Sequence, residues 1–170
     1  MPPELKLVLR RDLRRALAAG HPWIYRDALD RAPGSAGGSI EPGTVVRVEH
    51  ERRFVARGIA EAGPIAVRAW TTKDEPLDAA FVRRRVESAL ALRDRVTPPE
   101  TDAIRLVHGE GDRLGGVVCD RYGPYLVVQL DGEGAPVWRT EVIDALRAST
   151  RGVEGILVRT GRRGQKKIEL

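Results

Sequence analysis

Alternating apolar and polar positions at the N-terminus predict a short strand followed by a helix. Leu5, Leu7 and Leu9 recur with a period of two, which is typical of a strand with one buried face. From Asp12 to Ala19 the apolar residues follow helical spacing instead. Gly20 is suited to end this helix, because glycine readily adopts the left-handed conformation found after helix C-termini.

Three closely spaced strands are predicted next in the chain. Residues 32–43 are rich in glycine, serine and proline and predict a loop. Apolar runs at 44–49, 54–60 and 65–70 then alternate with short polar or Gly-Pro turns. Several short strands around one small helix favour a compact, barrel-like β module.

A long helix separates this module from a second group of strands. Residues 78–95 carry an apolar stripe at helical spacing, and prolines at positions 76, 98 and 99 bound it. We interpret this helix as a bridge. Beyond it the pattern predicts strands at 103–108, 116–121 and 125–130, a helix at 137–148 and a strand at 155–159.

The expected fold class is therefore α+β, a barrel-like β module followed by a small meander, helix and strand module. The predicted divisions are residues 1–73, the bridging helix at 74–99, and residues 100–170. No run of about 18 apolar residues predicts a membrane span. The N-terminus has no pattern of a secretory signal, so we expect a cytoplasmic location.

Net charge is +5 and comes mainly from arginine, which favours bidentate contacts with phosphate and stacking on bases. Composition alone leaves open that the charge merely keeps the surface solvated. An N-terminal and a C-terminal basic cluster are the candidate RNA-binding sites, the first with aromatic rings beside it. Their residues are Arg10, Arg11, Arg14, Arg15, His21, Trp23, Arg162, Arg163, Lys166 and Lys167.

Two of these assignments have a structural alternative. Trp23 follows a proline at the edge of a small module and is also typical of a residue that plugs a core. The C-terminal cluster also fits a tail or a linker. A third basic group, Arg83 to Arg85, fits the solvated face of the long helix.

Residues typical of catalysis and of metal binding are sparse. The sequence has no HExxH, P-loop or nucleophile-elbow motif, and its three histidines are far apart. We expect no catalytic and no metal site. Cys119 is the only cysteine and lies where an apolar strand residue is expected, so we interpret it as a core residue. Residues 109–116 are glycine-rich, but they join two predicted strands and are interpreted as a hairpin turn.

Two linked motifs resemble those of a known family. The first runs from Gly20 to Tyr25, GHPWIY, and is followed by Gly58-Ile59-Ala60 and Ile65 to Arg68. It resembles the N-terminal PUA domain of the SAM-dependent methyltransferases that form 5-methylcytosine in large-subunit rRNA. The second runs from Arg105 to Gly123, RLVHGEGDRLGGVVCDRYG. It is similar to the central strand-strand-helix-strand-strand domain of the same family.

The resemblance implies an RNA-binding role without chemistry on this chain. A PUA-like module would hold RNA, and rRNA in this family, through Arg10, Arg11, Arg14 and the residues from His21 to Trp23. The central module would orient that RNA. The resemblance extends over about the first two-fifths of such an enzyme, so SAM is expected only on the absent Rossmann-type domain, and no cofactor on this chain.

Two further hypotheses stay open. The chain fits a protein-interaction scaffold, a homodimer among the options, because an unpaired strand edge promotes pairing. It also fits a recognition subunit whose catalytic domain is supplied by a separate chain. Salt dependence separates RNA binding from an apolar interface, because contacts with phosphates weaken steeply as salt rises.

Overall fold

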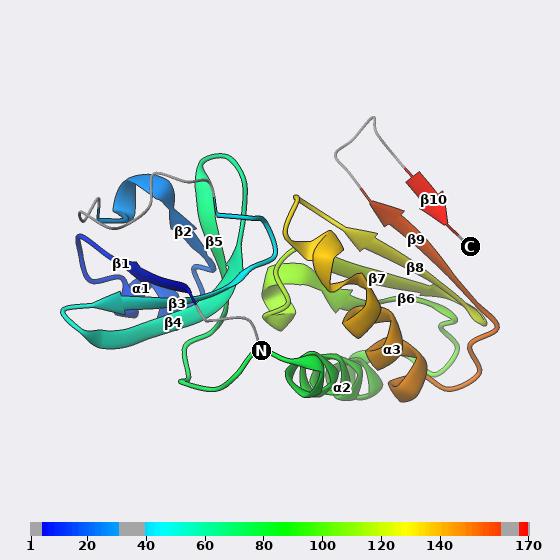
Figure 1. Cartoon of the computed structure of the whole chain (residues 1–170). Helices are drawn as coiled ribbons and strands as arrows, with labels where there is room; N and C mark the ends of the chain where they lie inside the picture. The colour runs from blue at the N-terminus through cyan, green and yellow to red at the C-terminus, as the bar shows by residue number, and fades with distance from the viewer. Residues whose placement is uncertain (1–4, 31–39, 161–166, 170) are drawn as a thin grey trace.

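The computed structural model describes residues 5–30, 40–160 and 167–169, and these form two five-stranded sheets. Each sheet belongs to one module, and the two modules lie side by side (Figure 1). The first module contains all elements up to residue 71, and the second contains the remainder. The α+β class expected from the sequence is confirmed.

The first module is a sheet with strand order β1-β3-β4-β5-β2. Strand β1 is parallel to β3, and the other neighbours are antiparallel. Its elements are β1 (Leu5–Val8), α1 (Arg14–Ala18), β2 (Trp23–Tyr25), the short helix η1 (Arg26–Ala28), β3 (Val45–His50), β4 (Arg53–Ala60) and β5 (Ile65–Thr71).

The two edges of this sheet meet, which makes the module barrel-like. Leu9, just beyond β1, forms a bridge with Leu29, just beyond η1. Two backbone bonds flank it, Arg10 N to the Ala28 oxygen at 2.9 Å and Asp30 N to the Val8 oxygen at 2.7 Å. Closure of this kind satisfies backbone groups that an open edge would expose.

Burial along β1 differs from the predicted alternation. Leu9 is buried, but Leu5 is 38% exposed and Leu7 is only half-buried. Burial increases toward Leu9 because this end of the strand is the one that joins the segment at Leu29. The apolar period therefore identified the strand but not how deeply each of its residues is buried.

The second sheet has strand order β10-β9-β8-β7-β6. Strand β8 is parallel to β9, and α3 makes the crossover between them. The elements are β6 (Ala103–His108), the short helix η2 (Gly109–Asp112), β7 (Val117–Tyr122), β8 (Tyr125–Leu130), the short helix η3 (Ala135–Trp138), α3 (Arg139–Ser149), β9 (Gly155–Thr160) and β10 (Lys167–Glu169). The pattern predicted every one of these strands except β10.

Helix α2 (Ala79–Val96) shares the core of the second module. Its N-terminus is capped by Asp78, whose carboxylate accepts a bond from the Phe81 backbone N–H at 2.7 Å. The helix packs on α3 and β6, so both long helices cover the same face of the second sheet (Figure 1). Helix α2 is thus part of the core of the second module as well as the connection that the sequence predicted. The domain boundaries stay a prediction.

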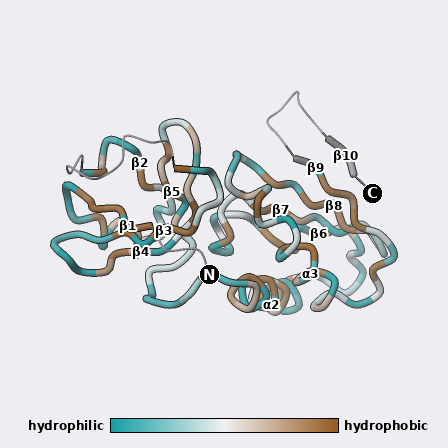
Figure 2. The backbone as a smooth tube through the Cα atoms, in the orientation of Figure 1, coloured by the Kyte–Doolittle hydropathy of each residue, from teal (hydrophilic) through white to brown (hydrophobic). Residues whose placement is uncertain are grey.

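One apolar core extends across the boundary between the modules. Hydrophobic positions follow the strands of both sheets (Figure 2). Ile59 and Trp70 belong to the first sheet, yet they pack in the core of the second module. The Trp70 ring lies 6.3 Å from that of Phe81 and 5.2 Å from that of Trp138, measured between centroids. This shared packing fixes how the modules sit against each other.

Candidate nucleic-acid interface

Helix α1 ends in a turn that projects His21 from the first module. Gly20 has φ of +98°, a left-handed conformation that favours glycine. His21 N donates to the Ala16 oxygen at 3.0 Å, and Gly20 N donates to the Leu17 oxygen at 3.1 Å. This pair of bonds is a Schellman motif, which satisfies carbonyl groups at the helix end. The predicted helix end at Gly20 is confirmed.

Most of the N-terminal basic residues face solvent around this helix. Arg10, Arg11 and Arg15 are exposed, whereas Leu17 packs inward. Arg14 differs because its guanidinium already has partners. It pairs with Asp12 at 3.2 Å and donates to the His50 carbonyl at 3.4 Å. We name the exposed side chains of Arg10, Arg11, Arg15 and His21 the α1 surface.

Three rings lie in sequence along the turn and β2. His21 is exposed and lies 6.1 Å from Tyr25 in a stacked arrangement and 6.2 Å from Trp23 edge-on, between centroids. Tyr25 is also exposed, but Trp23 is half-buried and its indole donates to the Glu110 carboxylate at 3.1 Å. This contact gives Trp23 a structural role between the modules, although Trp23 belongs to neither hydrophobic core, and it leaves His21 and Tyr25 as the accessible rings of the three.

A small cavity lies where the α1–β2 turn meets the second module. It has a volume of about 210 Å³ and is lined by residues of both modules, among them His21, Pro22, Gly111 and Arg113. Arg113 is exposed and adds a cation at the rim opposite the turn. The cavity therefore extends the α1 surface onto the glycine-rich connection between β6 and β7, where the sequence predicted only a hairpin turn.

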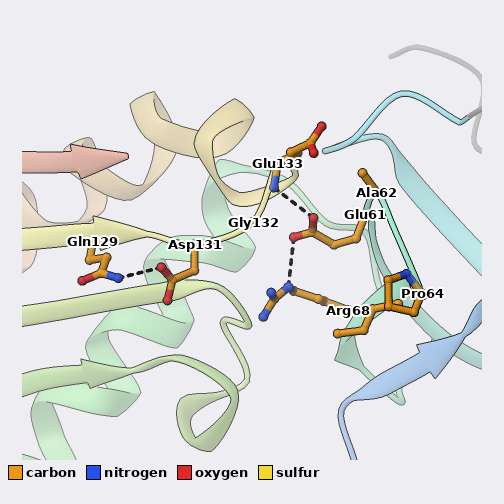
Figure 3. A pocket seen from close by; sticks show the side chains of 9 residues that line it. Glu61, Ala62, Pro64, Arg68, Gln129, Asp131, Gly132 and Glu133 are labelled. Carbon is orange, nitrogen blue, oxygen red and sulfur yellow. Dashed lines mark hydrogen bonds and ion pairs between the residues drawn. The ribbon is translucent and has the colours of Figure 1, made fainter. Parts of the chain in front are cut away.

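A network of charged groups joins the modules beside this surface. Glu61 has a side chain only 4% exposed, and Arg68 donates from Nε to one of its oxygens at 2.9 Å. The other oxygen accepts the backbone N–H groups of Glu133 and Gly134 at 3.0 and 3.2 Å. Figure 3 shows the bonds from Arg68 and Glu133. Arg68 also pairs with Glu110, the carboxylate that holds Trp23.

This junction borders a second and larger cavity that is poorly suited to phosphate. Its volume is about 510 Å³, and it is lined by Glu61, Asp131, Glu133 and Arg68 among others (Figure 3). Three carboxylates against one guanidinium repel an anionic backbone. The α1 surface is the better candidate for RNA contacts.

Among the remaining candidate residues, those of the C-terminal cluster, the structure describes only Lys167. Arg162, Arg163 and Lys166 lie outside the described residues, and Lys167 begins β10. The basic group on α2 is engaged with carboxylates: Arg83 pairs with Glu87 at 3.2 Å, and Arg84 pairs with Glu75 at 3.1 Å. These pairs support the interpretation of Arg83 and Arg84 as part of a solvated helix face, whereas Arg85 is half-buried and lies over the Phe81 ring.

Cys119 packs in the core of the second module, as the sequence predicted. Burial raises the pKa of its thiol to about 12, with a smaller contribution from the charge of Asp120. It therefore stays protonated at neutral pH. Among the residues that the structure describes, no three His, Cys, Asp or Glu side chains lie close enough to hold a metal ion.

The fold and this surface define the class of the N-terminal module. Residues 7–72 match the family of PUA-like domains. No described helix is long and apolar enough to span a membrane.

The similarity to particular proteins extends over both modules. The chain is 39% identical to ribosomal RNA large subunit methyltransferase I of Salmonella arizonae over 146 residues, and 36% identical to that of Cronobacter sakazakii over 148 residues. These matches cover 84% and 85% of this chain but 35% and 36% of the relatives. The chain thus spans about a third of their length, and it resembles their N-terminal part.

A solved structure shows the same fold. A protein of Streptococcus mutans classed among SAM-dependent methyltransferases superposes with a TM-score of 0.79 and 16% identity. The match covers 98% of this chain and 43% of that one. The predicted resemblance to the N-terminal and central domains of this family is confirmed.

Proposed function

We propose that the chain binds structured RNA of the large ribosomal subunit through the α1 surface. The single observation that carries this proposal is the PUA-like domain at residues 7–72, in which Arg10 and Arg11 before α1 and Arg15 on α1 are exposed to solvent. Guanidinium groups contact phosphates, and the neighbouring His21 and Tyr25 rings offer faces for an unpaired base.

The second module would then hold this surface in one orientation. The shared core and the Glu61 network attach it firmly to the first module. We propose that RNA held in this way is presented to a SAM-binding domain in the cytoplasm, and that this chain transfers no methyl group by itself. Support comes from the relatives, which are rRNA methyltransferases roughly three times as long. Methyl product formed by the purified chain with SAM would overturn that part of the proposal.

Charge reversal tests the RNA-binding surface. We expect Arg11→Glu/Arg15→Glu to weaken binding of a structured rRNA fragment at least about tenfold, because two phosphate contacts are lost and two repulsions are added. Arg83→Glu/Arg147→Glu makes the same change of charge on the exposed faces of α2 and α3 and serves as the control.

Equal losses in the two double variants would show that net charge alone attracts RNA and would contradict the α1 surface. Absence of RNA binding at low salt by the unmodified chain would favour the protein-interaction scaffold. Thermal unfolding of each variant verifies that the chain remains folded.

A further inference from the structure

The second sheet has a face that the described helices leave uncovered. Helices α2 and α3 pack on one side, where Leu126 and Val128 of β8 are fully buried. Tyr125, the first residue of β8, directly precedes Leu126. Its side chain therefore lies on the opposite face of the sheet, and the residue is 54% exposed. Because side chains alternate between the two faces of a strand, the strand register shows which residues lie on the uncovered face.

Aromatic and charged residues are placed together on this face by the pairing of β6, β7 and β8. Arg105 is directly opposite Asp120, and Tyr122 is opposite Tyr125. Tyr122 is 55% exposed, which is more than expected for an aromatic ring that packs in a core. The part of this face around Arg105, Asp120 and Tyr122 is therefore polar and aromatic, whereas Val118 and Val127 add half-buried apolar positions on the same face.

Arg105 and Asp120 form a fixed pair with unused hydrogen-bonding capacity. Arg105 donates from Nε and Nη2 to the two carboxylate oxygens at 2.8 and 3.1 Å. Its Nη1 lies 3.3 Å from Nδ1 of His108. The bond to Asp120 raises the pKa of Arg105, so the pair stays charged. Each carboxylate oxygen can accept a further bond, and the outer guanidinium hydrogens can still donate.

A cavity of about 330 Å³ lies over this pair. Ala103, Ile104, Arg105, His108, Asp120 and Tyr122 line it. Its volume is at the lower end of the range for small-molecule sites. The carboxylate makes it a poor phosphate site. An aromatic wall beside adjacent donors and acceptors suits a flat heterocycle, because bases stack on tyrosine and carboxylates accept bonds from exocyclic amino groups.

We propose that this cavity binds one unpaired RNA base that carries an exocyclic amino group. Tyr122 stacks on the ring, Asp120 accepts from the amino group, and Arg105 donates to a ring nitrogen or carbonyl. The inference rests on the proposed function and adds a second contact for the same RNA. A protein segment is the less favourable occupant, since it would bury Arg105, His108 and Asp120 away from water.

Single-stranded RNA hexamers containing 2-aminopurine test the cavity directly, because this base has an exocyclic amino group and loses fluorescence when it stacks. The full chain and its Tyr122→Phe variant are expected to quench the fluorescence. Tyr122→Ala is expected to reduce the quenching and to weaken binding about tenfold, in line with the loss of one stacked base. Leu92→Ala, a truncation at an exposed position of α2, is the matched control and should bind as the unmodified chain does.

Base selectivity provides the second measurement. The chain should bind oligoadenylate and oligocytidylate more tightly than oligouridylate, and Asp120→Ala should remove this preference. Unchanged quenching in Tyr122→Ala, or equal affinity for all three homopolymers, overturns the inference. If Tyr122→Ala changes neither quenching nor hexamer affinity, while the Arg11/Arg15 reversal still weakens binding of the structured rRNA fragment, only the base-binding role of the cavity is contradicted. If the chain binds neither RNA, the proposed function fails with it.

Discussion

Glu61 illustrates how a single side chain fixes the arrangement of the modules. Its carboxylate accepts bonds from Arg68 and from two backbone N–H groups that precede η3. Nothing in the sequence indicates this role, because Glu61 follows a strand in an ordinary turn and its two backbone partners lie more than 70 positions away. The apolar period reports on residues close together in the sequence, whereas the contact between Glu61 and the backbone before η3 depends on how the two folded modules pack against each other.

Replacing Glu61 by glutamine should lower the free energy of unfolding by about 2 kcal/mol, because a buried charge that accepts several bonds is lost and Arg68 keeps only Glu110. Glu87→Gln removes the carboxylate of an exposed pair with Arg83 and should change stability by less than about 0.5 kcal/mol. Urea unfolding measures both. Similar losses would show that Glu61 is no more important than a surface charge.

The Cys119 thiol gives a pH prediction at the same scale. Folding raises its pKa from 9.0 to about 12, so the fold favours the neutral form. Its contribution to stability is full below about pH 9 and is lost as the pH rises toward the folded value. We expect the native thiol to resist alkylation at pH 8 and to react only after denaturation. Rapid alkylation of the folded chain would contradict the burial.

Elements with a clear apolar period were predictable, and short elements were not. Residues 103–108 and 125–130 were predicted as strands with the bounds that the structure has for β6 and β8. The three-residue strand β10 and the bridge between Leu9 and Leu29 were missed. Both consist of too few residues to produce a pattern, and both depend on a partner distant in the chain.

The cap of α2 provides a test at the scale of the element. Asp78→Ala removes the acceptor for the Phe81 N–H and should destabilise the chain by about 1 kcal/mol. Asp94→Ala removes an exposed acidic residue near the other end of the same helix, where a negative charge is unfavourable, and should cost nothing. Denaturant midpoints compare the two. A larger loss for Asp94→Ala would contradict the assignment of the cap.

For the whole molecule, the two modules and their order followed from the apolar pattern and from the resemblance, but the contact between the modules did not. The N-terminal basic cluster was located from sequence, yet only the structure shows that Arg14 is engaged with Asp12 and that Trp23 reaches Glu110. The cavity on the second sheet was also missed. Arg105 and Asp120 are 15 positions apart, and only the strand register makes them neighbours.

The salt dependence of RNA affinity tests whether the α1 surface binds RNA through phosphate contacts. We would measure the dissociation constant for a structured rRNA fragment across a series of salt concentrations, with the unmodified chain and with Arg11→Glu/Arg15→Glu. We expect a steep loss of affinity as salt rises, and a slope of log affinity against log salt that is shallower by roughly 1.5 in the double variant, because each phosphate contact contributes about 0.7 to 0.9. Equal slopes, or affinity independent of salt, would contradict recognition of RNA by the α1 surface.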